Sequence, residues 1–225
     1  MNTEDSANSS LEKSQFLTKN KNKILEWTKN NKPKIIEARK NYSWGDKEPR
    51  VCLAERKDIT DSIKFSQSQN SGGIDLKTLD MIMNWGGFSA FPLRDEQKVL
   101  DITRRVFNLI NQNKVSEAVE ELLAIDGIEI VQASKIISLF DQNRFCSYDN
   151  NVANALKTLK FAQKPVLKCP VGPKKPEDIC SDERWGENYL HLIWTLEVIQ
   201  EYLNKKGHPL SIADIEMALF VMGKS

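Results

Sequence analysis

The stretch from residue 122 to residue 156 constrains the fold of this chain more than any other part of the sequence. Apolar residues recur at helical spacing on both sides of Gly127, and a short polar loop then leads to Asp149 and a further apolar periodic run. Apolar spacings of three and four indicate amphipathic helices, and a glycine between two such runs indicates a tight turn. An Asp directly before a periodic run is typical of a helix N-cap. The stretch therefore predicts two helices joined at Gly127 and a third that begins at Asp149.

Most of the remaining sequence also predicts helices. Residues 188–204 are apolar on nearly all sides, which is typical of a buried central helix. Ser211 is the expected N-cap of a last helix, in which Asp214 and Glu216 are expected to be partly exposed. No segment shows convincing strand alternation, so we expect an all-α fold. The segments with clear helical periodicity are 75–85, 95–110, 116–123, 188–204 and 212–222.

Four segments are less regular. Residues 1–17 are rich in Ser, Asn, Thr and acidic residues, and predict a disordered tail. Residues 21–42 predict two helical pieces broken at Pro33, because proline removes a helical hydrogen bond. Residues 43–73 have the least regular pattern. Residues 160–183 contain four of the eight prolines and predict a long connection.

Composition narrows the class of protein. A hydrophobic content of 40% and a charged content of 28% are ordinary for a globular protein. No apolar run approaches the roughly 18 residues that a membrane span needs, and the polar start lacks the apolar core of a signal peptide. We expect a cytoplasmic monomer with no membrane partner. The four scattered cysteines form no CxxC pair and predict reduced thiols, with no metal and no cofactor. A zinc site would have to use the set Cys169, Cys180, His191 and His208. The spacing of this set matches no known zinc finger.

The net charge of +1 conceals two basic segments. Residues 19–40 contain eight Lys and Arg residues against two acidic ones, and residues 160–175 contain five lysines and no acid. Such local basic surfaces can bind phosphate even when the whole chain is near neutral. The alternative is a solvated face, which charge runs usually form. The candidate DNA-binding lysines of the second segment are Lys168, Lys174 and Lys175.

The order of helix, Gly127 turn, helix, short loop and helix-opening Asp149 resembles the helix-hairpin-helix DNA glycosylase superfamily. Within it, the chain is most similar to a bacterial group with an 8-oxoguanine-glycosylase-like fold. The resemblance covers residues 75–160 and implies two helical subdomains around an active-site cleft. These would be a helix-hairpin-helix subdomain over 75–159, and an outer subdomain over 18–74 and 160–225. The motifs that carry the likeness are Ala133-Ser-Lys135, Arg144-Phe…Asp149 and Asp214-Ile-Glu-Met-Ala-Leu-Phe220.

The resemblance also implies roles for single residues. Asp149 would stabilise the positive charge that develops on the sugar, or activate a nucleophile; the alternative is a plain helix cap. Gly127 would let the hairpin approach backbone phosphate, although Glu129 stands where the family has a second glycine. Arg144, in the loop before Asp149, is a further candidate for DNA contact. Trp85 would stack on an extruded base, the alternative being a core residue.

The family's nucleophilic lysine is replaced in this chain. In bifunctional members a lysine four residues after the first glycine attacks the sugar, and the corresponding residue is Val131. Lys135 lies one turn further along the helix, roughly 6 Å away. It would be catalytic only if the substrate sat differently; otherwise it would face solvent or contact backbone.

Two hypotheses follow. The first is a DNA glycosylase of base excision repair, a hydrolase that binds double-stranded DNA and excises a modified or damaged base. With Val131 at the lysine position it would be monofunctional and rely on Asp149. The second is a non-catalytic module that binds nucleic acid or protein on a glycosylase scaffold, because a fold does not fix a function.

Overall fold

The computed structural model describes residues 3–43, 47–161, 164–165 and 185–224. Within these residues the structure is all-α, as the sequence predicted, apart from one antiparallel pair of two-residue strands. No helix in the described ranges is long and apolar enough to cross a bilayer. The elements are α1 (Thr3–Lys40), α2 (Pro49–Gln69), α3 (Leu76–Trp85), α4 (Glu96–Asn111), α5 (Val115–Leu123), α6 (Ile130–Phe140), α7 (Asn150–Ala155), β1 (Lys160–Phe161), β2 (Lys164–Pro165), α8 (Trp185–Lys205) and α9 (Ile212–Met222).

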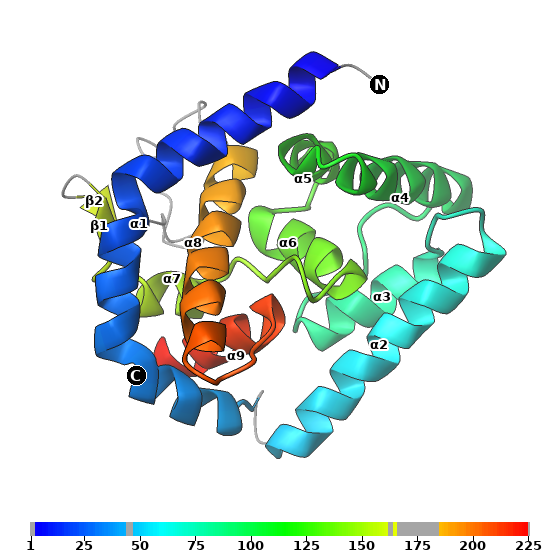
Figure 1. Cartoon of the computed structure of the whole chain (residues 1–225). Helices are drawn as coiled ribbons and strands as arrows, with labels where there is room; N and C mark the ends of the chain where they lie inside the picture. The colour runs from blue at the N-terminus through cyan, green and yellow to red at the C-terminus, as the bar shows by residue number, and fades with distance from the viewer. Residues whose placement is uncertain (1–2, 44–46, 162–163, 166–184, 225) are drawn as a thin grey trace, which may run out of the picture.

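The helices pack as two groups (Figure 1). In the first, α1 packs on α8 and α9, and α7 packs on α9; in the second, α2 to α6 contact one another. Packing of α5 against α8 joins the groups. The grouping differs from the expected subdomain boundaries in two places, because α2 lies with α3 and α6, and α7 lies with α9. The predicted central helix is confirmed, since α8 is buried against α1, α5 and α9.

The N-terminal segment is more ordered than its composition predicts. The disordered tail over residues 1–17 and the break at Pro33 are both wrong for the described residues, because α1 is one helix from Thr3 to Lys40. Phe16, within the polar segment, and Ile35, just after Pro33, are both buried. Tertiary packing therefore outweighs the polar composition and the hydrogen bond that is lost at Pro33. Figure 1 shows α1 bending around α8, as a helix with an internal proline does.

The helix α2 occupies part of the segment that had the least regular sequence pattern. Pro49 stands in its first turn, where the missing N–H costs nothing. The buried face of α2 is hard to recognise in the sequence, because two of its five buried residues are polar. These residues are spaced by four and three: Cys52, Arg56, Ile59, Ile63 and Ser66.

The predicted helix boundaries are confirmed where capping side chains set them. Gly127 has a φ of +85°, a left-handed conformation that favours glycine, and it lies in the turn between α5 and α6. Four side chains accept a hydrogen bond from the backbone N–H three residues later, at 2.7 to 3.1 Å. They are Asp75, Asp95, Asp149 and Ser211.

Candidate functional site

The helix α6 carries Lys135 into the interior of the protein. Gln132 closes the start of this helix, because its Oε1 accepts from the backbone N–H of Glu129 at 3.1 Å. Every residue from 133 to 139 is buried, and Lys135 is only 5% exposed. The alternative to a catalytic role was that Lys135 faces solvent or contacts backbone. The solvent-facing form is wrong, and contact with backbone stays a prediction.

Aromatic rings and opposite charges surround the Lys135 amine. Its Nζ lies 5.2 Å from the centre of the Trp85 ring and 5.9 Å from that of Phe88. Burial lowers the pKa of Lys135, and the nearby charges of Asp149 and Glu216 oppose this effect. A lysine amine that is more easily deprotonated than an exposed one is suited to act as a nucleophile.

The close approach of α3 to Lys135 depends on Gly86. A Cβ at this position would lie 2.8 Å from the Phe88 ring and 3.0 Å from Cδ of Lys135. Both distances are shorter than a normal contact, so any other residue would displace the ring or the lysine. The Gly86-Gly87 pair, predicted only to end a helix, also lets the aromatic residues pack onto Lys135.

Asp149 is both the cap of α7 and part of this site. Its Oδ1 accepts from the backbone N–H of Val152 at 2.9 Å, and the residue is only 9% exposed. Burial raises the pKa of Asp149, while the Val152 hydrogen bond and the charge of Lys135 oppose the rise. The shifts bring the proton affinities of this acid and this base closer together than in water. The site therefore holds a carboxyl group and an amine whose pKa values are shifted in opposite directions.

A buried ion pair, which sequence reasoning missed, lies near these residues. Nη2 of Arg56 lies 2.9 Å from Oε2 of Glu216, and the two residues are 2% and 3% exposed. Glu216 is thus buried, not partly exposed as the sequence suggested. Burial raises the pKa of Glu216, and the charge of Arg56 opposes the rise. Burial also lowers the pKa of Arg56, but its interactions with Glu216 and Tyr42 outweigh this and raise the pKa overall.

Several polar atoms of this cluster have unused hydrogen-bonding capacity. Among the described residues, Nε1 of Trp85 and Nη1 of Arg56 are buried and have no hydrogen-bond partner. Oε2 of Glu216 and Nη2 of Arg56 contact each other as an ion pair without hydrogen-bond geometry. Buried polar groups of this kind are uncommon and are often retained for function. The cluster of Arg56, Trp85, Lys135, Asp149 and Glu216 is hereafter called the buried charge cluster.

The other predicted site residues lie elsewhere. Gly127 is exposed in its turn, where a Cβ would contact Pro92 at 3.4 Å. Arg144 contacts its own protein, because Nη2 donates to Oδ1 of Asn113 at 2.9 Å and the guanidinium lies 4.9 Å from the Phe145 ring centre. The structure therefore brings together Trp85, Lys135 and Asp149 but not Gly127 or Arg144. The lysines at 168, 174 and 175 lie outside the described residues.

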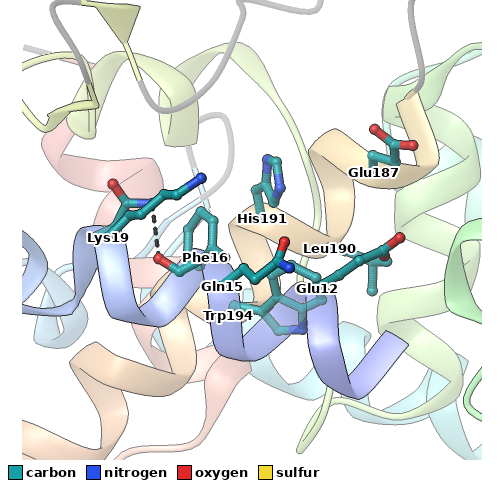
Figure 2. Close-up of a pocket in the computed structure, with 9 residues that line it drawn as sticks. Glu12, Gln15, Phe16, Lys19, Glu187, Leu190, His191 and Trp194 are labelled. Atoms are coloured by element: carbon teal, nitrogen blue, oxygen red, sulfur yellow. Dashed lines mark hydrogen bonds between the residues drawn. The ribbon is translucent and has the colours of Figure 1, made fainter. Parts of the chain in front are cut away.

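A separate pocket lies between α1 and α8 (Figure 2). It has a volume of about 390 Å³, and none of its lining residues belongs to the buried charge cluster. Phe16 and His191 stack there with ring centres 4.7 Å apart, and burial lowers the pKa of His191. No group of three or more metal-ligating side chains occurs among the described residues.

The two halves of the site come from helices that are distant in the sequence. Lys135 and Asp149 come from α6 and the start of α7, whereas Arg56 and Glu216 come from α2 and α9. Together they form a compact set of two buried acids and two buried bases next to an indole ring. No family model, curated protein or solved structure significantly matches this chain.

Proposed function

We propose that this protein is a DNA glycosylase that removes a modified or damaged base, with Lys135 as the nucleophile and Asp149 as its acid–base partner. The observation that carries the proposal is the burial of the Lys135 amine between aromatic rings and near the Asp149 carboxylate. The resemblance of residues 75–160 to the helix-hairpin-helix glycosylases supplies the substrate class. The burial of Lys135 favours a lysine nucleophile over the activated water of a monofunctional enzyme.

The proposed reaction uses groups that the protein contains. The nitrogen lone pair of neutral Lys135 bonds to C1′ of the nucleotide, the bond between C1′ and the base breaks, and the base leaves with that electron pair and takes up a proton. The nitrogen then loses a proton, for which the Asp149 carboxylate is the acceptor. As the C1′–O4′ bond breaks and the sugar ring opens, Asp149 returns this proton to O4′. The product is a protonated imine between Lys135 and C1′, which borohydride reduces to a stable adduct.

Binding an extruded base requires a movement of the protein. Lys135 and Asp149 are almost fully covered, and Trp85 and Phe88 lie over the amine. Displacement of the C-terminal end of α3 would uncover Lys135 and present the Trp85 ring to the base. Such closure over a bound substrate is common, because it excludes water from the reaction.

Borohydride trapping tests this proposal. Duplex oligonucleotides that each carry one modified base are incubated with protein and borohydride, and covalent adducts are separated by denaturing electrophoresis. We expect an adduct with at least one lesion, and its loss in Lys135→Gln but not in Lys64→Gln, which changes an exposed lysine of α2. Base excision without any adduct would instead favour the monofunctional mechanism, in which Asp149 acts with water.

The second candidate function is a binding module without catalysis. Glu129 is exposed at the turn where the family has a glycine, and a carboxylate there repels phosphate. Duplex binding by a folded protein that excises no base from a broad lesion panel, and gives no adduct, would favour this module over an enzyme.

A further inference from the structure

Arg56 contacts two other members of the buried charge cluster and the loop beside it. Its guanidinium pairs with Glu216 of α9, lies 5.6 Å from the ring centre of Trp85 of α3, and donates through Nε to Oε1 of Gln142 at 2.9 Å. Gln142 lies in the loop after α6. A single α2 side chain therefore contacts residues from three other parts of the chain.

Gln142 is itself held firmly in place. Its Nε2 donates to Oγ1 of Thr60 at 2.6 Å, and its backbone carbonyl accepts from the N–H of Ala213 at 3.1 Å. Thr60 lies one turn after Arg56 on α2, and Ala213 lies one turn before Glu216 on α9. Gln142 thus connects α2, through its side chain, to α9, through its backbone carbonyl, close to the ion pair of Arg56 and Glu216.

We propose that Arg56 is a positioning residue that binds the Glu216 carboxylate so that Glu216 does not hold the Lys135 amine in its protonated form. A buried carboxylate without a partner is strongly unfavourable and seeks the nearest cation. The two buried cations of the cluster are Arg56 and Lys135, and Glu216 forms its ion pair with Arg56. The inference rests on the proposed function in that Lys135 must be neutral to react.

The charged groups that influence Lys135 come from three other helices or their ends. Arg56 of α2 lowers the pKa of Lys135, whereas Glu216 of α9 and Asp149 at the start of α7 raise it. Trp85, the last residue of α3, and Phe88, just after the Gly86-Gly87 pair, present their aromatic rings to the amine. Tyr42 in turn influences the pKa of Arg56, and Lys224 influences that of Asp149. The buried side chains of Cys146 and Tyr189 also interact with Glu216, which raises their pKa values.

Because Arg56 and Glu216 act on Lys135 with opposite signs, their removal has opposite effects. Loss of Arg56 leaves Glu216 free to stabilise the Lys135 ammonium, so the pKa of Lys135 rises. Loss of Glu216 removes a stabilising charge, so the pKa falls. Loss of both restores a pKa between those of the two single variants. A purely structural role for Arg56 predicts no such ordering.

The test is a pH titration of Lys135 by NMR in protein labelled with carbon-13 in lysine, with Lys135→Gln used to assign the signal. Wild type, Arg56→Met, Glu216→Gln and the double variant are compared. We expect the Lys135 pKa to be highest in Arg56→Met, lowest in Glu216→Gln, and intermediate in the double variant. An unchanged or lower pKa in Arg56→Met would overturn the proposal.

Two further measurements keep the outcome decisive. If Arg56→Met does not fold, Glu216→Gln alone decides, because an unchanged Lys135 pKa in that variant contradicts the proposal. For an active enzyme, the rising part of the single-turnover rate against pH should move to higher pH in Arg56→Met and return in the double variant. The titration needs no DNA, so failure of wild type to excise any base would refute the proposed function without affecting the result for Arg56.

Discussion

Nζ of Lys135 lies 5.2 Å from the ring centre of Trp85, and the Arg56 guanidinium lies 5.6 Å from the same ring. Two cations therefore share one indole in the protein interior. The electron-rich face of the ring partly compensates for the water that these cations lose, and this attraction is strongest where solvent is excluded. Trp85 thus stabilises the charges of the site whether or not it also contacts a substrate.

Trp85→Phe should separate the two properties of this side chain. Phenylalanine keeps an aromatic face but removes Nε1, a buried donor with no partner among the described residues. Removing an unsatisfied donor offsets part of the lost packing, so we expect the free energy of unfolding in urea to change by no more than about 1 kcal/mol. A fall in the excision rate without a matching loss of stability would assign Nε1 a role in substrate binding. A loss of several kcal/mol would contradict the prediction.

Lys135→Met should abolish the trapped adduct and stabilise the fold. Methionine has a similar shape and needs no hydration, so we expect a gain of about 1 kcal/mol at neutral pH. Because burial holds the pKa of Lys135 below its ordinary value of 10.5, the folded state binds fewer protons than the unfolded state between the two values. Wild-type stability should therefore rise with pH in that window. Urea unfolding at several pH values should show this rise in wild type and a smaller one in Lys135→Met.

Asp149→Asn should remove base excision with little loss of stability. The asparagine oxygen can still accept from the Val152 N–H, so the cap of α7 remains. Because burial raises the pKa of Asp149 above its ordinary value of 3.8, its ionised form costs stability that builds up as pH rises from that value through the raised one. The stability of Asp149→Asn relative to wild type should increase over the same range. Thermal unfolding at pH 3 to 8 would measure it, and a variant that becomes relatively less stable would contradict the assignment.

Gly86→Ala should impair the site more than the fold. The added Cβ would meet the Phe88 ring at 2.8 Å and the Lys135 side chain at 3.0 Å, so one of them must move. We expect overpacking to cost about 1 to 3 kcal/mol and the adduct yield to fall. The double variant Gly86→Ala with Phe88→Leu, which shortens the opposing ring, should recover part of the stability. If Gly86→Ala alone behaves as wild type, α3 is not packed on Lys135 as described.

DNA binding should depend on the lysines of residues 160–175 and not on Arg144. Replacement of Lys168, Lys174 and Lys175 by Gln should weaken duplex binding and reduce its dependence on salt, because fewer counterions are released. Arg144→Gln should leave affinity unchanged, since its guanidinium already contacts Asn113 and Phe145. Fluorescence anisotropy at 50 and 200 mM salt provides the comparison. Equal affinities for the triple variant and wild type would exclude these lysines as the DNA contact.

The sequence identified the parts of the structure whose signals are local. Asp75, Asp95, Asp149 and Ser211 each mark a helix start, because an N-cap lies within three residues of the backbone group that it binds. Gly127 likewise marks its own turn. These caps marked the starts of α3, α4, α7 and α9, and apolar periodicity predicted the helices at 116–123 and 188–204.

What the sequence did not predict depends on contacts between distant segments. Pro33 ordinarily ends a helix, and only the packing of α1 on α8 and α9 keeps it continuous. Nothing in the local sequence distinguishes Arg56 from an exposed arginine, because its partner Glu216 is contributed by the distant helix α9. The pairing of two charges on helices at opposite ends of the chain leaves no pattern in either segment, and Lys135 alone gave no sign of burial.

The distribution of the buried charge cluster along the chain has a consequence for folding. Arg56 and Glu216 are far apart in sequence from each other and from Lys135 and Asp149, and contacts of this kind form only after the intervening chain has been brought together. Until then the four side chains are hydrated, and each helix can form without dehydrating them. We expect the loss of this water to be concentrated in the step in which the two groups of helices dock. Salt and pH should therefore alter the rate of that final step more than the rate at which the individual helices form.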